Sequence, residues 1–396
     1  MINTANYDTL TLEELTGVVG KKWTTFPDTI GAFIAEMDFR TAPSVIAALR
    51  ETVDNGFFGY LPVAMEEGLA KVCAGWYEQN TDWAVPAERV HSLPDVLKGL
   101  EITLRLYAPK GGKVIVPTPA YMPFLTVPQV HDREIVQVPM LKNDGRWEYD
   151  LDALDAAFTD GAEVLILCNP FNPIGRVMTR EEMLAISEIV DRHGGRVFSD
   201  EIHAPIVYEG HRHVPYASIS ETAASHTITA IAASKAWNLA GLKTAQIVIS
   251  NDADEAIWQD TGAHLGHGAS TLGVIASIAA YTTGQEWLDG VLAYLDGNRR
   301  WLEEAVGERL PGVCYTVPEG TYLAWLDFCQ SGLAGDLLDG DLAQYFRENA
   351  RVAVVDGGAC GNVGKGCVRF NFAMPRPILE RAIDQMAAAI QVKQPA

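Results

Sequence analysis

The sequence lacks the features of several large classes of protein. Its 396 residues carry 30 basic against 51 acidic side chains, a formal net charge of −21, so it has no excess of lysine and arginine with which to bind nucleic acid or an anionic membrane. The N-terminus MINTANYDTL has no basic patch followed by an apolar run, and we expect no signal peptide. The longest stretch without an acidic or basic side chain, 261–285, contains two histidines and five glycines. We expect a buried helix with a glycine-rich lead-in there, not a membrane span.

Cysteine is also scarce, and its spacing argues against cross-linking. The six cysteines form no C-x-x-C pair and lie in apolar stretches, at positions 73, 168, 314, 329, 360 and 367. We therefore expect reduced core residues in a cytoplasmic protein, without a disulfide framework.

The composition that remains is that of an ordinary globular protein, with 48% apolar and 20% charged residues. A chain of 396 residues exceeds the size at which a single hydrophobic core usually stops growing. We expect two domains, with uncertain boundaries near residues 50 and 284.

Short β-rich runs alternate with helical patterns between residues 88 and 250. One helix is predicted over 95–107, with Val96, Leu97, Leu100 and Leu104 on one face, and another over 179–193. The alternation predicts an α/β domain over 50–283 whose mostly parallel, seven-stranded sheet lies between helices. Its strands are predicted at 89–93, 113–116, 133–138, 162–168, 196–199, 227–233 and 245–250.

The pattern changes after residue 284. A long helix is predicted over 287–308, short strands over 313–316, 322–327 and 366–372, and an amphipathic end helix whose first turn contains Pro377. These elements predict a smaller α+β domain, 284–396, completed by residues 1–49.

Ligands of open parallel sheets bind at the carboxyl ends of the strands. The residues expected there are Asp95, Tyr121, Asn172, Asp200 with His203, and Lys235. Asp200 and Lys235 each follow an apolar strand, where a charge is costly unless it is paired or used. The two side chains could form a structural ion pair or take part in chemistry.

The motif NPFNPIG at 169–175 favours chemistry. It fixes five positions, and at roughly 5% usage per residue a chance match in such a chain is on the order of 1 in 10,000. A proline-stiffened turn without a ligand accounts for rigidity but leaves the second asparagine unexplained.

The order of motifs resembles that of pyridoxal 5'-phosphate (PLP) enzymes with the aspartate aminotransferase fold. N-P-x-N-P-x-G is followed by S-D-E at 199–201, S-K at 234–235, Lys243, and R-x-N at 369–371. Further segments are similar to the cystathionine β-lyase and cysteine carbon–sulfur lyase group (MalY/PatB type). They are IAEMDF at 34–39, FGY at 58–60, SDEIH at 199–203, SKAWNLAGL at 234–242, TYLAWLDF at 321–328 and VRFNFAMPR at 368–376.

The resemblance implies a role for each residue at the strand ends. Lys235 would hold PLP covalently and then remove the substrate Cα proton. Asp200 would keep the pyridine nitrogen protonated, and Asn172 would donate to the 3'-oxygen, so that the rigid turn places one amide. His203 would serve the same oxygen or, alternatively, lie in a surface loop. Tyr121 would stack on the ring or, as a bare aromatic, belong to the core.

The same resemblance implies a phosphate site and a second subunit. The backbone N–H groups of Asp95 and Val96 open a helix whose positive end favours an anion, and Ser234 and Lys243 would add contacts. Tyr60 would reach the phosphate from a second subunit, which implies a homodimer with shared sites. Two positions depart from many relatives: Ala232 replaces a phosphate-binding serine, and Asp95 brings a carboxylate that we expect to point away and cap its helix.

Arg369 would bind the substrate carboxylate bidentately, a geometry that lysine cannot match, although an arginine in that strand could also be structural. Ala35, Tyr121 and Asn172 complete the expected substrate site. The implied reaction is β-elimination of cystathionine or another S-substituted cysteine to thiol, pyruvate and ammonia. Either Tyr60 or Lys235 would protonate the departing sulfur. An aminotransferase is the alternative, since the same residues serve both reactions.

Two other classes remain open from the sequence. His203, His211 and His213 could bind zinc in a hydrolase, because the H-x-H spacing at 211–213 can chelate a metal, but a glycine-flanked surface loop is the plainer interpretation. A regulator that retains the fold is the other, since a fold does not dictate function. Intact Lys235, Asp200 and Arg369 argue against lost catalysis.

Overall fold

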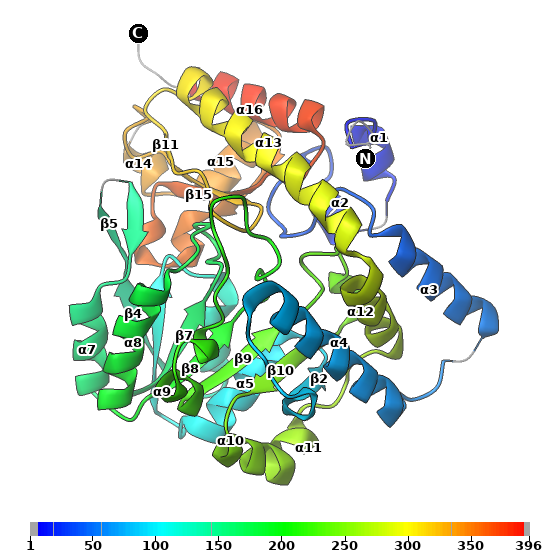
Figure 1. Cartoon of the computed structure of the whole chain (residues 1–396). Helices are drawn as coiled ribbons and strands as arrows, with labels where there is room; N and C mark the ends of the chain where they lie inside the picture. The colour runs from blue at the N-terminus through cyan, green and yellow to red at the C-terminus, as the bar shows by residue number, and fades with distance from the viewer. Residues whose placement is uncertain (1–6, 19, 57, 144, 334, 392–396) are drawn as a thin grey trace.

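The computed structural model describes residues 7–391 except 19, 57, 144 and 334. Figure 1 shows a large sheet with its surrounding helices in the lower half of the molecule, and the C-terminal helices above it. The chain therefore has the two-part α/β arrangement that its strand and helix pattern predicts.

The large sheet has seven strands in the order β2-β10-β9-β8-β7-β3-β4. Strand β10 runs antiparallel to both of its neighbours, and the other pairs are parallel. The inner strands are buried along almost their whole length, as expected for a sheet covered on both faces. All seven predicted strands are confirmed, at Val90–Leu93 (β2), Lys113–Thr118 (β3), Glu134–Pro139 (β4), Ala162–Cys168 (β7), Arg196–Asp200 (β8), Thr227–Ile231 (β9) and Ala245–Ile249 (β10).

Helices cover this sheet, and their first turns follow from the sequence. Asp95 caps α5 by accepting a hydrogen bond from the Lys98 N–H, and Thr179 and Glu182 form a reciprocal capping box at the start of α8. The helices of this part are α4 (Val63–Thr81), α5 (Val96–Tyr107), α6 (Val127–Val130), α7 (Leu151–Thr159), α8 (Arg180–Arg192), α9 (Glu221–Ser225), α10 (Asp252–Ile257), α11 (Ala263–Leu265) and α12 (Thr271–Thr283). Helix α12 confirms the helix expected within 261–285.

The C-terminal part is built on an antiparallel sheet in the order β11-β12-β15-β14. Its strands are Cys314–Tyr315 (β11), Leu323–Asp327 (β12), Val355–Asp356 (β14) and Cys367–Asn371 (β15). Its helices are α13 (Gln285–Arg309), α14 (Gly335–Leu338), α15 (Leu342–Asn349) and α16 (Arg376–Gln391). The predicted long helix, three short strands and amphipathic end helix are all present.

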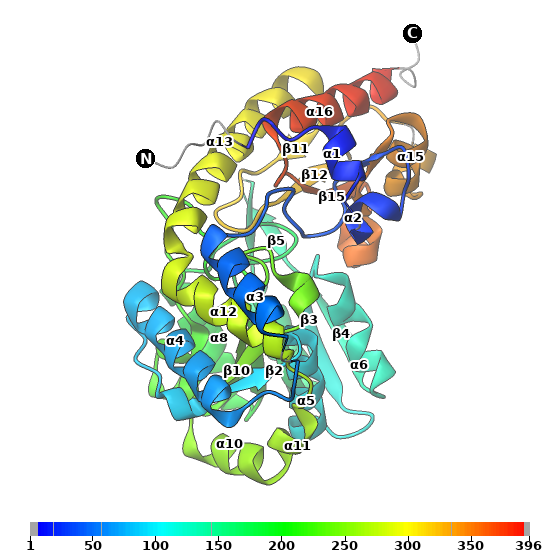
Figure 2. The ribbon, with the colours of Figure 1, turned by 90° about the vertical axis from the view of Figure 1, so that its right-hand side faces the viewer.

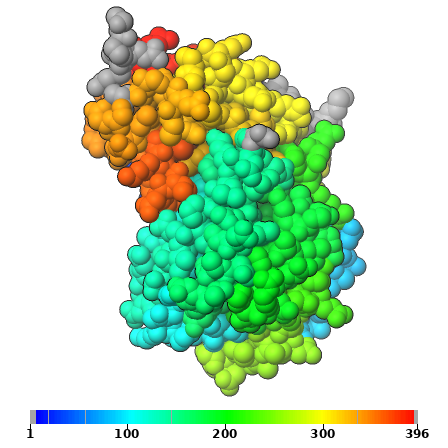
Figure 3. All heavy atoms as spheres, turned by 90° about the vertical axis from the view of Figure 1, so that its left-hand side faces the viewer, coloured from blue at the N-terminus to red at the C-terminus, as the bar shows by residue number. Residues whose placement is uncertain are grey.

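N-terminal residues pack against this C-terminal part. Strand β1 (Ile30–Gly31) pairs in parallel with β13 (Val352–Ala353). Figure 2 shows α1 (Leu12–Thr16) and α2 (Lys21–Thr24) beside α15 and α16, while α3 (Pro43–Asn55) lies along α12. The space-filling view in Figure 3 shows the yellow-to-red C-terminal residues as an upper layer on the cyan and green sheet region. The boundaries near residues 50 and 284 stay a prediction.

The structure also bears on the search for a membrane-spanning helix and on the burial of the cysteines. No helix in the described part of the chain has the length and apolarity needed to cross a bilayer. All six cysteines are free thiols, but the prediction that all lie in the core is wrong for two of them. Cys329 is exposed and Cys314 is half-buried, because both lie where the short outer strand β11 and the end of β12 leave the small sheet uncovered.

Candidate active site

The carboxyl ends of neighbouring strands bring the predicted polar residues to one edge of the large sheet. Asp200 ends β8, the Asn169 turn follows β7, and Lys235 lies four residues beyond β9. Arg369 enters from β15 of the small sheet, where it pairs with Trp325 and Val355 on either side. The site therefore lies between the two parts of the molecule.

The two asparagines of the NPFNPIG motif have different roles in the fold. Asn169 Oδ1 accepts a hydrogen bond from the Met178 N–H at 3.0 Å and so closes the turn. Gly175 has φ +71°, and an added Cβ would lie 2.2 Å from the Pro318 Cβ, so only glycine allows the turn to approach the small part this closely. Asn172 is left facing Arg369, whose Nη1 donates to its Oδ1 at 3.0 Å.

Lys235 is an amine in an unusual environment. Burial is the main cause that lowers its pKa, to about 8, and the nearby Arg369 guanidinium lowers it further, while Glu36 and Asp200 act in the opposite direction. Its Nζ donates to the Ala35 carbonyl oxygen at 2.8 Å. A substantial fraction of free amine is therefore present just above neutral pH, which is what a nucleophile or a base requires.

Asp200 is a buried carboxyl group with little compensation from the protein. Burial raises its pKa to about 7, although the hydrogen bond from the Ile202 N–H at 3.0 Å and the charge of Lys235 lower it. The adjacent Glu201 is fully buried but accepts hydrogen bonds from Tyr77, Ser199, His213 and the backbone of Tyr216. Glu201 is thus satisfied by the protein, whereas Asp200 is open to a cationic partner.

Arg369 has the donors that a carboxylate needs. Its guanidinium is buried, its Nη2 donates to the Phe33 carbonyl oxygen at 2.7 Å, and its Nε has no partner among the residues that the structure describes. Burial lowers its pKa from the usual value. A planar group held by the Phe33 carbonyl and Asn172 presents a fixed fork to an incoming carboxylate.

His203 lies inside the site rather than in a surface loop. Only 1% of it is exposed, and neither ring nitrogen has a partner in the described part of the chain. Burial lowers its pKa well below the usual value, which favours the neutral ring. Its ring meets Tyr322 edge-on, with centroids 5.9 Å apart. Tyr121, half-buried beyond β3, packs edge-on against Phe124, and burial raises its pKa.

Three of the residues predicted to bind the phosphate, Asp95, Val96 and Lys243, lie together at the start of α5. The Asp95 side chain caps the helix, which confirms the predicted capping, and its other oxygen is paired with the Lys243 ammonium. Val96 is the first residue of α5, and Ser234 lies half-exposed next to Lys235. The Lys243 charge is thus shared with Asp95.

Tyr60 is a predicted site residue that its own chain does not bring to the site. It lies in the extended link between α3 and α4 and is fully exposed. It lines a surface groove of about 1230 Å³ that also includes His91, Ser92 and His267.

The unpartnered groups at the site match what the expected cofactor requires. Asp200 offers a carboxylate to a cationic ring nitrogen, and Lys235 offers an amine to an aldehyde. His203 and the Arg369 Nε are buried polar groups without partners within the described residues. Because buried polar groups are normally satisfied, these residues fit a polar ring with cationic and anionic positions.

Several residues of the site were not identified from the sequence. The Tyr322 hydroxyl donates to the Ala35 carbonyl at 2.9 Å. The Glu36 carboxylate acts to raise the pKa of both Lys235 and Tyr322. Both lie in segments quoted for the resemblance, IAEMDF and TYLAWLDF, so the signal was present without a role attached.

The structure separates the three histidines of the zinc hypothesis. His213 is buried against Glu201, His203 lies beside Lys235 and Arg369, and His211 is exposed on the surface loop. No cluster of three or more potential metal ligands is found in the described ranges. The hydrolase alternative thus has no assembled centre to support it.

Comparison with known proteins agrees with this geometry. A family model described as aminotransferase class I and II matches residues 31–386. The chain is 39% identical over 380 residues to a cystathionine beta-lyase of Corynebacterium glutamicum, covering 96% of this chain and 99% of that one. It is 32% identical to the cystathionine beta-lyase PatB of Bacillus subtilis, with 96% and 98% covered. The structure matches the PLP-bound C-S lyase of Staphylococcus hominis with a TM-score of 0.89 and 28% identity over 97% of this chain and 98% of that one.

Proposed function

Since this chain belongs to the aminotransferase class I and II family, we propose that its site performs the β-elimination of a PLP-dependent carbon–sulfur lyase. The substrate is L-cystathionine or another S-substituted L-cysteine, and the products are a thiol, pyruvate and ammonia. The observation that carries this proposal is the half-buried amine of Lys235, with its lowered pKa, placed among Asp200, Arg369 and Asn172.

PLP, when bound, supplies an aldehyde for the amine and a ring that withdraws electrons from the substrate Cα. Asp200 would keep the ring nitrogen protonated, because a buried carboxylate strongly favours a cationic partner. Asn172 and His203 would bind the 3'-oxygen, and Tyr121 would stack on the ring. The backbone N–H groups of Asp95 and Val96 with Ser234 and Lys243 would hold the phosphate.

Arg369 binds the substrate carboxylate beside Asn172, Tyr121 and the Ala35 backbone, which orients the Cα–H bond toward Lys235. Lys235 Nζ, as a free amine, would accept the Cα proton. The Cβ–S bond then breaks with its electron pair leaving on sulfur, which takes up a proton to become the thiol. The three-carbon remainder is hydrolysed to pyruvate and ammonia.

The exposed position of Tyr60 supports a homodimer in which this residue completes the partner subunit's site. Mixing Tyr60→Phe chains with Lys235→Ala chains, each of low activity alone, is expected to restore about a quarter of wild-type activity. Half of the randomly assembled dimers are mixed, and one of their two sites carries no change. If Tyr60 acted within its own chain, both sites of the mixed dimer would be defective, and no activity would return.

Product analysis tests the reaction itself. Purified PLP-loaded protein given L-cystathionine is expected to release pyruvate and free thiol in equal amounts, because both come from one Cβ–S cleavage. Pyruvate is measured with a coupled dehydrogenase and thiol with a chromogenic disulfide. If neither forms, while a 2-oxo acid and an ordinary amino acid exchange their amino group, the site is that of an aminotransferase.

A further inference from the structure

The segment 33–39 closes one side of the site, and side chains hold its backbone at almost every residue. Lys235 and Arg369, the two residues assigned to proton transfer and carboxylate binding, donate to the Ala35 and Phe33 carbonyl oxygens. Other side-chain donors bind the carbonyls of Ile34 and Glu36 (Asn371, 2.7 Å to each), of Ala35 (Tyr322, 2.9 Å), and of Met37 and Phe39 (Asn238, 3.0 and 2.8 Å).

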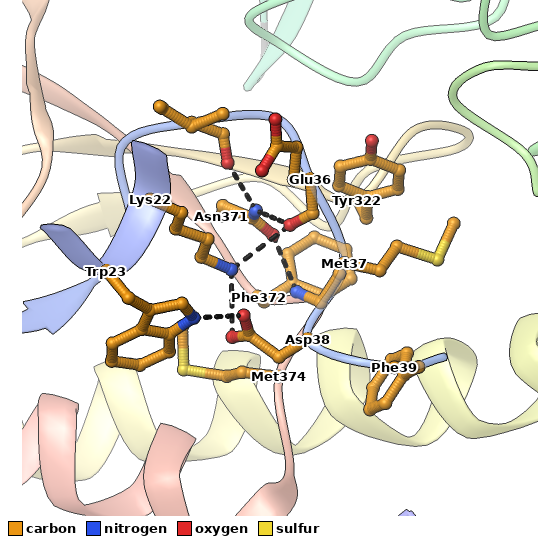
Figure 4. Close-up of polar contacts among 12 residues, drawn as sticks. Lys22, Trp23, Glu36, Met37, Asp38, Phe39, Tyr322, Asn371, Phe372 and Met374 are labelled. Atoms are coloured by element: carbon orange, nitrogen blue, oxygen red, sulfur yellow. Dashed lines mark hydrogen bonds and ion pairs between the residues drawn. The ribbon is translucent and has the colours of Figure 1, made fainter. Parts of the chain in front are cut away.

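A buried ion pair anchors this segment from the side away from the site. The Lys22 ammonium lies 2.8 Å from Asp38 Oδ2 and donates to the Glu36 carbonyl at 3.1 Å, while the Trp23 indole donates to Asp38 Oδ1 at 2.9 Å. Both charged side chains are only 2% exposed. Figure 4 shows the Lys22 ammonium between the Asp38 carboxylate and the Glu36 main chain, with the side chains of Glu36 and Tyr322 pointing away from the pair.

We propose that Lys22 and Asp38 are positioning residues for the reaction: their ion pair fixes the segment 33–39 so that its carbonyls meet Lys235 and Arg369. This inference rests on the function proposed above. The pair touches neither reacting group, and it acts on them through the Glu36 carbonyl and the backbone between Ala35 and Asp38. Lys22 and Trp23 lie on α2, so the N-terminal helix takes part in building the site.

A role in packing alone does not require charges at these positions. Moving two charges out of water is costly, and replacing a buried pair with apolar residues of similar volume is often neutral for stability. What the apolar residues cannot do is bind the Glu36 carbonyl and the Trp23 indole. Replacing the pair with apolar residues therefore keeps the packing but removes these hydrogen bonds, so the packing role and the positioning role can be tested separately.

A shift of the segment 33–39 is expected to lower the pKa of Lys235. The charged groups that face its ammonium are Arg369, which disfavours the charge, and Glu36 and Asp200, which favour it. The Ala35 carbonyl also favours the ammonium by accepting its hydrogen bond. If the segment shifts, Lys235 loses the Ala35 oxygen and the Glu36 charge, and its pKa falls.

The test is the double variant Lys22→Met/Asp38→Leu, which leaves no unpaired buried charge. Its control is Arg196→Met/Asp254→Leu, an ion pair of a half-buried arginine and a buried aspartate at the opposite end of β8 from Asp200. The first readout is the rate at which the cofactor-free, full-length chain takes up PLP, followed by absorbance from pH 6 to pH 10. This rate rises with pH as the free amine forms. The pKa of Lys235 predicts that the wild-type rate reaches half of its maximum at about pH 8.

The midpoint of the Lys22/Asp38 variant is expected to fall by about one pH unit, with kcat/KM of the holoenzyme about tenfold lower. The control variant is expected to keep the wild-type midpoint and the wild-type kcat/KM. It should do so even though it loses as much resistance to urea as the Lys22/Asp38 variant, or more. An unchanged midpoint, an upward shift caused by water entering the site, or the same change in the control would overturn the proposal. PLP uptake does not depend on the products, so this test stands even if cystathionine is not cleaved.

Discussion

The Lys235→Ala variant is expected to bind PLP without a covalent link and to lose about 10³-fold or more in kcat. Proton transfer by one positioned group contributes about 10²–10⁴-fold, and the same residue also supplies the amine that holds the cofactor. Absorbance after dialysis follows cofactor retention, and pyruvate release follows turnover. The environment of Lys235 makes the loss specific, because burial and Arg369 lower the pKa of this amine to about 8.

A second lysine provides the control for this result. Lys98 lies on α5, is about one quarter exposed and pairs with Glu101 at 3.0 Å. The Lys98→Ala change removes the same functional group near the same sheet edge and is expected to leave turnover nearly unchanged. If Lys235→Ala kept turnover within about tenfold of the wild type, the proton transfer would belong to another group.

The Asp200→Asn variant is expected to lose about 10²–10³-fold in turnover and to release PLP more readily. Removing one preorganised group that stabilises developing charge has an effect of that size. Asparagine fills the same space and can still accept from the Ile202 N–H, but it carries no charge to keep the ring nitrogen protonated. Measured kcat and the PLP retained after gel filtration report the two effects separately.

The neighbouring Glu201 offers the matched comparison for Asp200. It is another fully buried carboxylate, but its donors are Tyr77, Ser199, His213 and the Tyr216 backbone. Glu201→Gln is expected to lower the free energy of unfolding, because one of these donors meets an amide N–H₂ instead of an oxygen. Its retention of PLP is expected to stay close to wild type. Equal loss of PLP in both variants would mean that Asp200 acts through the fold alone.

The large sheet was predictable because its strands can be recognised from short apolar runs in the sequence. Runs such as 162–168 are apolar on both faces, which only a covered parallel sheet requires, and the helices between them start with recognisable caps. The hairpin β5 (Leu141–Asn143) and β6 (Arg146–Glu148) was not predicted. Its strands are only three residues long, β5 exposed and β6 half-buried throughout, so they show no alternation between a buried and an open face.

The candidate site was predictable where a motif stands at a strand end, as for Asn172, Asp200 and Lys235. The Lys22–Asp38 pair escaped notice because nothing in the sequence links a lysine in a four-residue helix to an aspartate sixteen residues later. Only the closure of the segment 33–39 over the sheet makes them neighbours. Cys329 was placed wrongly since an apolar context along the chain does not reveal that a sheet ends there.

The place of β15 inside the small sheet has a consequence for how the chain is made. Every strand of the large sheet lies within residues 90–249, so that sheet can form while the ribosome is still adding the last third of the chain. Strand β15, which carries Arg369, inserts between β12 and β14 and cannot do so until about residue 371 has emerged. Strand β1 (Ile30–Gly31), synthesised early, pairs with β13 (Val352–Ala353) and so acquires its partner late. A nascent chain therefore contains Lys235 before β15 can place Arg369, so under the roles proposed above cofactor binding comes before substrate recognition.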